Sequence, residues 1–298
     1  MTTQPGPLSQ WGTGPDPRPG VPVVIAPGVV RLTAPNPSMM TGPGTNTYLV
    51  GERRVLVIDP GPDDPAHRRR IIDVLEGREV VGIAVTHTHP DHAPGARRLA
   101  SVTQAPQLGF ASGPGFDPDK RIADGELIGE PDSLLRVLHT PGHASDHCCY
   151  LLERVGLLFT GDHVMEGSTV VIRPPDGDVG AYVASLRRII EHRPAIASLA
   201  PGHGRVIEDP EGAVREIIAH RQAREALVLS ALAARGAASA QELLDAVYPG
   251  LEATRHDIAT ATLWGHLRHL GQQGELRPVG CALGDDSTDT VFCVDDPS

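Results

Sequence analysis

Three histidines and an aspartate stand within one short segment of the chain, and their side chains are suited to binding metal. The segment contains His87, His89, Asp91 and His92 and directly follows the apolar run VVGIAV. Imidazole and carboxylate groups are ligands that suit Zn²⁺. In a tight loop His87 and His89 can point the same way, while Asp91 and His92 turn toward a neighbouring point. The segment therefore predicts a metal-binding loop rather than a solvated polar turn.

Three more polar residues follow apolar runs further along the chain. His143 stands in TPGHASDH, Asp162 in FTGDH and His203 in APGHG, so each has a glycine beside it. Glycine lets the backbone bend sharply, which can aim a ligand inward. Any one of them alone is weak evidence, because a single His or Asp after a strand is usually structural. Together with the 87–92 segment they predict a metal site assembled from several loops.

This set of residues resembles the ligand set of the metallo-β-lactamase-fold hydrolases, over residues 23–205. The resemblance implies two metals, each held by three residues: His87, His89 and His143 for the first, and Asp91, His92 and His203 for the second. It also implies that Asp162 bridges the two metals, together with a water or hydroxide. The implied cofactor is Zn²⁺, two ions per chain, with Mn²⁺ or Fe²⁺ as alternatives.

A narrower resemblance covers nearly the whole chain after its first residues. The stretches NPSMMTGPGTNTYLVG and GDHVMEGST, with the helical tail that follows, are similar to the β-lactamase-like protein 2 family. That family includes RNA-cleaving hydrolases and related thioesterases. The resemblance implies a dinuclear zinc-dependent phosphodiesterase, an endoribonuclease acting on single-stranded RNA. The alternative is a thioester or lactone hydrolase of the glyoxalase II type, or a weak β-lactamase.

The chemistry expected of such a site is hydrolysis. Two metal ions at one site can lower the pKa of a shared water toward about 7, and the activated water attacks phosphorus or a carbonyl carbon. Asp91 is then both a ligand and a candidate general base. Asp59, in VLVIDPG just after a predicted strand, could orient a ligand histidine from outside the metal site. Its alternative role is that of a turn residue.

Further polar residues stand close to the predicted ligands. His147 and His163 could contact substrate or protonate a leaving group; the alternative for each is a packed, hydrogen-bonded histidine. The family resemblance also places four residues in loops near the site, where they could donate hydrogen bonds to substrate or serve only as turn residues: Asn46, Thr47, Ser168 and Thr169.

The ligands need a framework in which several strands end at one edge. Short apolar runs predict strands at 23–34 (two), 46–51, 53–61, 80–87, 133–143, 148–154, 156–162 and 194–204. Helical spacing predicts helices at 64–77, 94–102, 179–192, 211–235, 239–248 and 255–274, and a two-stranded ribbon follows at 275–296. In the first helix, Ile71, Ile72 and Leu75 are expected to share one face. We expect an α/β fold, the αββα metallo-β-lactamase sandwich, with a small C-terminal winged-helix domain.

These elements divide the chain into four parts. Residues 1–22 are rich in Pro and Gly and predict a disordered or loosely draped arm, which Trp11 could dock. Residues 23–210 form the expected catalytic domain, 211–236 a linking helix and 237–298 the winged-helix-like domain. On the second helix of that last domain, four residues stand where a DNA-binding winged helix places contacts: His256, His266, Arg268 and His269.

The charge of the chain argues against sequence-specific DNA binding. The 298 residues carry a formal net charge of -11, and 237–298 contain three Arg against ten acidic residues, a net of -7. A phosphate-binding domain is usually basic. We therefore expect a packing or dimerisation domain and a homodimer, since Leu263, Leu267 and Leu270 need a surface to pack against.

The remaining expectations concern location and partners. The sequence shows neither a secretory signal nor the long apolar run of a membrane span, and its four cysteines form no CxxC pair. We expect reduced thiols, a cytoplasmic protein and no membrane partner. The expected substrate is RNA or a small-molecule ester.

Overall fold

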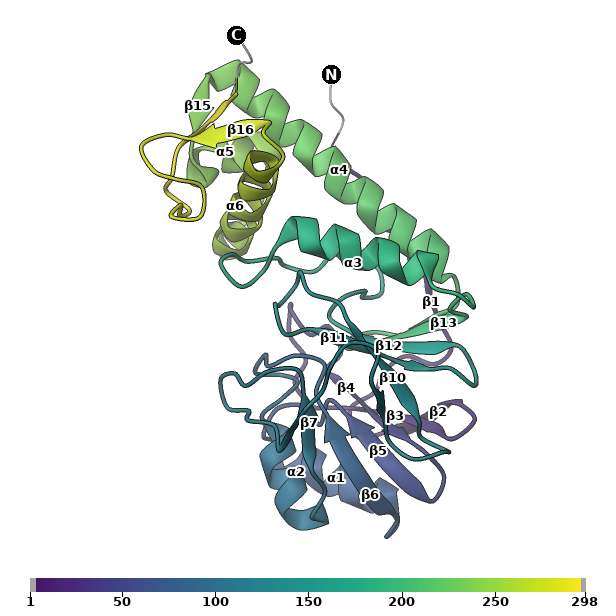
Figure 1. The fold of residues 1–298 in the computed structure, drawn as a ribbon. Helices are drawn as coiled ribbons and strands as arrows, with labels where there is room; N and C mark the ends of the chain where they lie inside the picture. The colour runs from purple at the N-terminus through teal and green to yellow at the C-terminus, as the bar shows by residue number, and fades with distance from the viewer. Residues whose placement is uncertain (1–3, 296–298) are drawn as a thin grey trace.

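Two seven-stranded mixed sheets face each other in the part of the chain that the computed structural model describes, residues 4–295 (Figure 1). The ends of the expected arm (1–3) and of the expected C-terminal domain (296–298) lie outside it. The first sheet contains, in spatial order, β2 (Pro22–Ala26), β3 (Val29–Thr33), β4 (Asn46–Val50), β5 (Arg54–Ile58), β6 (Glu79–Ala84), β7 (Gln107–Gly109) and β8 (Lys120–Arg121). The second contains β1 (Gly12–Thr13), β14 (Val206–Ile207), β13 (Ser198–Pro201), β12 (Leu157–Gly161), β11 (Cys148–Leu152), β10 (Leu135–His139) and β9 (Leu127–Ile128).

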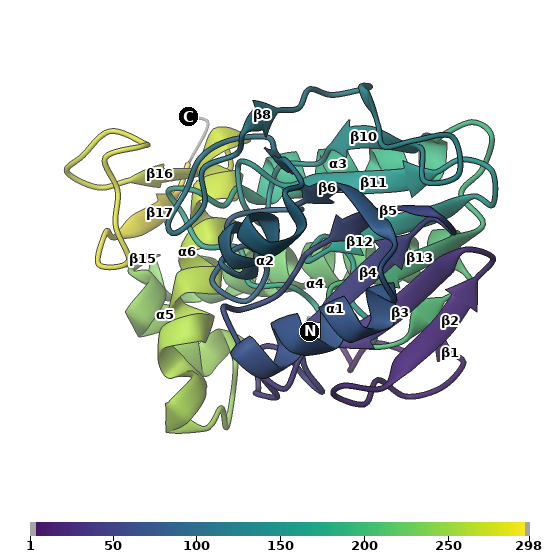
Figure 2. The same ribbon diagram turned by 90° about the horizontal axis from the view of Figure 1, so that it is seen from below.

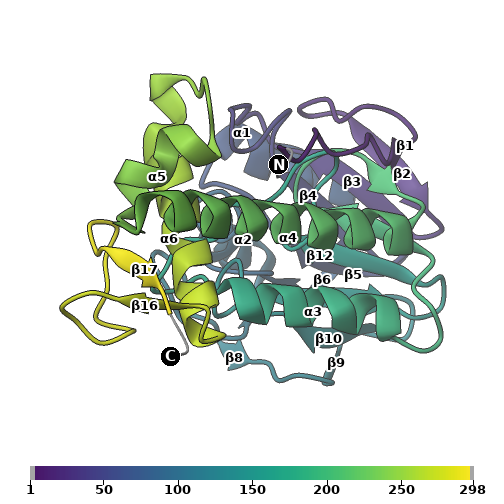
Figure 3. The same ribbon diagram turned by 90° about the horizontal axis from the view of Figure 1, so that it is seen from above.

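Helices cover the outer face of each sheet. Helices α1 (Pro65–Leu75) and α2 (Gly95–Thr103) lie on the first sheet (Figure 2). Helices α3 (Val179–Glu191) and α4 (Pro210–Arg235) lie side by side over the second (Figure 3). The α/β fold and its four layers are confirmed.

Each continuous apolar strand contributes side chains to two hydrophobic cores, because successive side chains point to opposite faces of a sheet. In β5, Val55 and Val57 pack against α1 and α2, whereas Leu56 and Ile58 pack between the sheets. On α1, Ile71 and Leu75 are buried, but Ile72 is exposed, so the expectation that all three share a face was wrong. Ile72 is rotated about 100° from Ile71 and points off the buried stripe.

Strand direction brings the polar loops to one edge. Strand β12 runs parallel to β13, and β10 and β12 are both antiparallel to β11, so these three strands end at the same edge of the second sheet. In the first sheet β6 runs parallel to β5 and ends at Ala84, three residues before the expected end. The loops that follow these strands carry the predicted metal ligands.

Of the two alternatives for the N-terminal arm, disorder or a draped arm docked by Trp11, the described residues 4–22 show the docked arm. Gly12 and Thr13 pair with Val206 and Ile207 as an edge of the second sheet, and the Trp11 indole N–H donates to Glu216. The Pro- and Gly-rich composition did not show these contacts, because they are made with residues about two hundred positions away.

The C-terminal domain has its own core and shares α4 with the catalytic domain. Helices α5 (Ala240–Val247) and α6 (His256–Gln272) pack on the end of α4, beside a three-stranded sheet of β15 (Ala237–Ala238), β17 (Phe292–Val294) and β16 (Leu276–Pro278); a short 3-10 turn, η1 (Ala253–Arg255), precedes α6. At 26 residues α4 is about 39 Å long, which lets its first half pack on the second sheet and its last half on α5 and α6. The more specific winged-helix assignment stays a prediction.

The apolar residues expected to need a partner chain are covered within this one. Leu263, Leu267 and Leu270 lie buried among residues of α4 and α5. Dimerisation is therefore not required to bury them, and the expected homodimer stays a prediction. Within residues 4–295, no helix is both long and apolar enough to cross a membrane.

Candidate metal centre

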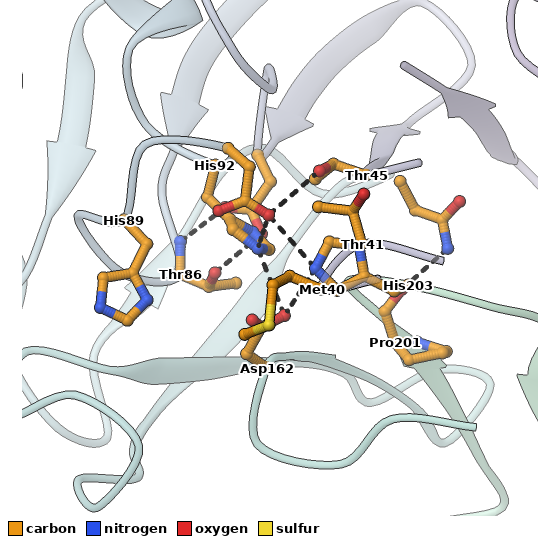
Figure 4. Close-up of polar contacts among 12 residues, drawn as sticks. Met40, Thr41, Thr45, Thr86, His89, His92, Asp162, Pro201 and His203 are labelled. Atoms are coloured by element: carbon orange, nitrogen blue, oxygen red, sulfur yellow. Dashed lines mark hydrogen bonds and ion pairs between the residues drawn. The ribbon is translucent and has the colours of Figure 1, made fainter. Parts of the chain in front are cut away.

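The seven residues predicted as metal ligands come together where strands of both sheets end. His87, His89, Asp91 and His92 lie in the loop between β6 and α2, and the other three lie after β10, β12 and β13: His143, Asp162 and His203. The first sheet thus supplies four of them and the second sheet three. Figure 4 shows His92, Asp162 and His203 converging from these separate loops.

One group consists of three histidine nitrogens that face one another. His87 Nε2 lies 2.9 Å from His89 Nδ1, and His143 Nε2 lies 3.0 Å from the same Nδ1 atom. His143 Nδ1 donates to the carbonyl oxygen of Val171 at 2.8 Å, so the neutral ring presents a lone pair at Nε2. Lone pairs that converge in this way are stabilised by a shared cation.

A second group lies beside it and contains more negative charge. His203 Nε2 lies 3.3 Å from Asp91 Oδ2, and His92 Nε2 lies 3.4 Å from that oxygen. Asp162 stands between the groups: its Oδ1 is 3.2 Å from both His92 Nε2 and His203 Nε2, and its Oδ2 is 3.7 Å from His143 Nε2. Each oxygen of Asp162 therefore faces a different group.

The electrostatics of the second group favour positive charge. Burial opposes ionisation of Asp162, but the charges of His203 and His92 hold the pKa of its carboxyl well below the usual range. Burial would lower the pKa of His203, but Asp162 and Asp91 raise it to about 9. Two carboxylates in a nearly closed site are stabilised by cations, whether protons or metal ions.

Two atoms of this centre test whether a metal fits. His92 Nε2 and Asp162 Oδ1 are buried and make no hydrogen bond to any described residue. Buried polar atoms are rarely left in this state. Both face the point on which the other ligand atoms converge, and nitrogen and carboxylate oxygen form a donor set suited to a transition metal. The residues present fit two metal ions, one in each group.

Asp59 lies behind the second group. His92 Nδ1 donates to Asp59 Oδ2 at 2.8 Å, and the same carboxylate accepts from the backbone N–H and the hydroxyl of Thr86, each at 2.7 Å. The bond fixes the ring so that His92 Nε2 faces Asp91 and Asp162. Asp59 adopts φ 48°, a conformation rare outside glycine, which turns the chain at the end of β5.

Asn46 and Thr47 do not lie where a substrate could reach them. Both are buried in β4. Asn46 Nδ2 donates to the carbonyls of Pro201 and Gly204, at 3.0 and 2.9 Å, and so spans the turn that carries His203. The Thr47 hydroxyl donates to the carbonyl of Asp59 at 2.6 Å. Neither of the two alternatives, a substrate contact or a turn residue, describes them, because the loop position implied by the family resemblance is a buried strand here.

His147 and His163 are also packed behind the centre. Both are fully buried, and neither lines the cavity described below. His147 Nε2 accepts from the backbone N–H of Asp162 at 3.2 Å, which holds Asp162 in place. His163 packs against the ring of Tyr182. Of the two alternatives, the packed histidine is the one that the structure shows.

A cavity of about 990 Å³ opens from the metal centre. Five predicted ligands line it, and so do Ser168 and Thr169, for which the sequence left a substrate contact or a turn role open. Met40 and Thr41, from the loop before β4, also line it and lie in front of the centre in Figure 4. The opposite wall comes from α4 and α6.

The sequence analysis missed this opposite wall, although α4 contains a signal of it. Arg221 and Arg224 stand on the apolar face of α4 together with Ile217 and Val228, because the four residues are spaced as one helical stripe. Two arginines on a buried stripe need a partner or an opening. The cavity is that opening, since both line it.

Comparisons with known proteins agree with this architecture. The family model described as the metallo-beta-lactamase superfamily matches residues 40–113 and 108–203. The chain is 32% identical over 269 residues to the beta-lactamase-like protein 2 homolog of Drosophila melanogaster, covering 84% of this chain and 89% of that protein. It is 37% identical over 238 residues to the atrochrysone carboxyl ACP thioesterase of Aspergillus chevalieri, covering 75% of this chain and 74% of that protein.

A solved structure extends the likeness to the whole fold. The crystal structure of a beta-lactamase domain protein from Burkholderia ambifaria matches with a TM-score of 0.78 at 22% identity, over 93% of this chain and 94% of that one. The match therefore includes the C-terminal domain as well as the sandwich. With its two converging ligand groups, this chain belongs to the metallo-beta-lactamase superfamily of metal-dependent hydrolases.

Proposed function

We propose that the protein is a dinuclear zinc-dependent hydrolase whose substrates are thioesters. The observation that carries this proposal is the cavity, which is bounded on one side by the metal centre and on the other by the C-terminal domain. Much of its lining is apolar: Met39, Met40, Val170, Leu251 and Ile258. Such a chamber suits an acyl chain of limited size. The relative named as a thioesterase supports the same reaction class.

The residues of the candidate metal centre have distinct roles in this proposal. His87, His89 and His143 would hold one metal ion, and Asp91, His92 and His203 the other, with Asp162 between them. When bound, the ions supply a water nucleophile active near neutral pH and polarise the carbonyl oxygen. Asp91, part exposed to the cavity, accepts from the Thr45 hydroxyl at 3.3 Å and is placed to take the proton of the attacking water. Asp59 keeps His92 oriented.

The leaving group also favours a thioester. A thiol has a pKa of about 8.5, so a thiolate can leave without a strong general acid. An alkoxide leaving group needs a proton donor more, and the two histidines considered for that role, His147 and His163, do not line the cavity. For this reason the carbonyl reaction, the alternative in the sequence analysis, becomes the leading proposal.

Cleavage of single-stranded RNA is the second candidate. It is favoured by Arg173 and Arg255, two exposed arginines that line the cavity and form no ion pair within residues 4–295. Bases of single-stranded RNA usually stack on aromatic side chains. Among the described lining residues Tyr248 is the only Phe, Tyr or Trp, and the Arg224 guanidinium already lies 4.1 Å from its ring centroid.

Zinc is the proposed metal because the ligand set is rich in imidazole, and Mn²⁺ or Fe²⁺ are the alternatives. A cytoplasmic location is proposed as well. All four cysteines are unpaired thiols, which is usual for a reducing compartment. Cys148 and Cys149 are buried in β11.

One kinetic comparison tests the function. Zinc-loaded protein is assayed with acyl N-acetylcysteamine thioesters, acyl-CoA, a lactone, a single-stranded RNA oligonucleotide and a chromogenic cephalosporin. We expect thioesters to show a kcat/KM at least about a hundredfold above that for RNA, with loss of turnover after chelation. Faster cleavage of RNA than of any thioester would overturn the proposal in favour of the second candidate.

A further inference from the structure

Two arginines are buried in the wall of the cavity that faces the metal centre, and no carboxylate neutralises them. Arg221 is 2% exposed and Arg224 is 8% exposed, and both line the cavity. Neither forms an ion pair with a described residue. An isolated buried cation is costly unless it is paired. Their place in a cavity wall allows a ligand to supply the missing negative charge.

The contacts that the two arginines do make leave donors free. Arg221 donates to the carbonyl oxygen of Val170, and its guanidinium lies 5.3 Å from the ring centroid of Tyr182. Arg224 Nη1 donates to the carbonyl oxygen of Val247 at 2.6 Å and to Gln4 Oε1 at 3.2 Å, and the guanidinium lies over the Tyr248 ring. The Nε atoms of both arginines are buried and have no hydrogen-bond partner in the described residues. Backbone carbonyls thus fix the guanidinium groups without neutralising them.

The surroundings of this pair contain one further positive charge, that of Arg255, and a neutral histidine, His220. Burial and the charges of Arg224 and Arg221 lower the pKa of the neighbouring His220 to about 4. Arg255, in the turn before α6, lines the same cavity and is exposed. The acidic side chain closest along the helix, Glu225, lies against His266 at 3.4 Å.

Carboxylates in the cavity do not cancel this charge. Apart from the predicted ligands Asp91 and Asp162, the one described carboxylate in the lining is Asp176, which accepts from the Ser145 hydroxyl. The cavity therefore has a metal-binding end and a second, cationic wall on α4.

We propose that Arg221 and Arg224, assisted by Arg255, form an anion subsite that binds a carboxylate or phosphate group of the substrate while the metal centre holds the scissile carbonyl. Guanidinium groups bind such oxyanions through paired, charge-assisted hydrogen bonds. The proposal rests on the proposed hydrolase function and adds the class of substrate: an acyl thioester with a second, anionic group. The anion could belong to the acyl part, as a carboxylate, or to the thiol part, as the phosphate of phosphopantetheine.

Matched substrate pairs distinguish these two sources. One arm compares ω-carboxyacyl N-acetylcysteamine thioesters, from succinyl to suberyl, with neutral acyl thioesters of the same length. The other arm compares acyl pantetheine with acyl 4′-phosphopantetheine. In the wild-type protein we expect at least one anionic substrate to exceed its neutral match in kcat/KM by tenfold or more. Equal values in both arms would overturn the proposal.

Variants of the arginines test whether the preference for anionic substrates depends on the proposed subsite. In Arg224→Gln the anionic-over-neutral ratio of kcat/KM should fall at least fivefold. Arg255→Gln, at an exposed position where folding is not at risk, should lower the ratio by a smaller factor. Arg215→Gln is the control, because Arg215 lies on the same helix, is exposed, and pairs with Glu211 outside the cavity. If kcat/KM fell equally for the anionic and the neutral substrate in Arg224→Gln and Arg255→Gln, these arginines would have only a structural role. That result would contradict the proposal.

A binding measurement separates failure of the subsite from failure of the proposed function. Calorimetric titration of zinc-loaded protein with adipate, and separately with 4′-phosphopantetheine, needs no turnover. We expect one of them to bind wild type and Arg215→Gln alike, and Arg224→Gln and Arg255→Gln more weakly. If that holds while no thioester is cleaved, the subsite stands and the hydrolase function fails. If thioesters are cleaved but neither probe binds, or the variants bind equally, the subsite fails alone.

Discussion

At the scale of single residues, the candidate metal centre is held in place by groups outside the predicted ligand set. Asp59 orients His92, Asn46 spans the turn that carries His203, and His147 holds the backbone of Asp162. Outer groups of this kind usually set ligand geometry and metal affinity. The substitutions that test the centre therefore include residues outside the ligand set.

Removing the carboxylate between the two groups should disable the centre. In Asp162→Ala both groups lose a shared anionic neighbour, so we expect loss of most of one metal per chain and a fall in turnover of more than about a hundredfold. Metal content and turnover are measured on the same preparation, with His89→Ala beside it. Asp176→Ala is the control, since Asp176 lines the cavity but contacts Ser145. A fully active Asp162→Ala protein with normal metal content would show that Asp162 does not bridge.

Removing the hydrogen bond between His92 and Asp59 should weaken metal binding without removing a predicted ligand. For Asp59→Asn we expect metal affinity to fall by about 10- to 100-fold, measured by competition with a chelator. Asp73→Asn, an exposed substitution on α1, provides the matched control. Unchanged affinity in Asp59→Asn would mean that the bond from His92 Nδ1 is dispensable.

The sequence predicted the candidate metal ligands better than it predicted the residues that hold those ligands in place. Its residue types and spacing predicted seven residues that the structure brings together, because alternate residues after a strand and glycine-flanked turns leave few directions for a side chain. For Asn46, Thr47, His147 and His163 it left two alternatives open, a substrate contact or a structural role, and it could not decide between them. Nearness to a ligand along the chain does not tell whether a side chain faces the cavity or the core.

At the scale of elements, the turn after β13 depends on β4 of the other sheet. Asn46→Ala would remove the two bonds from Nδ2 and leave the carbonyl of Gly204 without this partner, whereas the carbonyl of Pro201 would still accept from the Tyr48 hydroxyl at 2.6 Å. We expect a loss of about 1–3 kcal/mol in the free energy of unfolding, the usual cost of one unpaired buried group. Chemical denaturation of the metal-loaded protein measures it. A loss below about half a kcal/mol would mean that the turn is stable by itself.

Long apolar or periodic segments were predictable at this scale, and very short strands were not. The main strands and all six α-helices follow from the hydrophobic pattern to within a few residues. Strands β1, β7, β8, β9, β14 and β15 have two or three residues each, too few to show a period. They form by pairing with neighbours that the fold brings to them, so no local pattern marks them.

At the scale of the whole molecule, the C-terminal domain is a part of the cavity and of the core of α4. Leu227, Val228 and Leu232 on α4 are buried against it. A chain that ends at Gly236 would expose them, so we expect aggregation or a clearly lowered Tm, and loss of thioester turnover with loss of the cavity wall. Size-exclusion chromatography and thermal unfolding measure the first, kinetics the second. A monodisperse truncated chain with full activity would contradict this role.

The sequence predicted a packing role for this domain but not that it closes the cavity. His266, Arg268 and His269, expected where a DNA-binding helix makes contacts, lie instead against Glu225 or Asp286 of the same chain. Which face of α6 is covered depends on how α4 carries the domain over the metal centre. That arrangement arises from contacts between distant segments, which periodicity does not encode.

The measurement that tests the central claim most directly is the location of the metals. A crystal of the zinc-loaded protein, with anomalous scattering recorded at the zinc edge, shows each ion without assuming any reaction. The account predicts two peaks, one among His87, His89 and His143, and one among Asp91, His92 and His203, with a carboxylate oxygen of Asp162 facing each. A single peak, or two peaks away from these residues, would contradict the dinuclear centre.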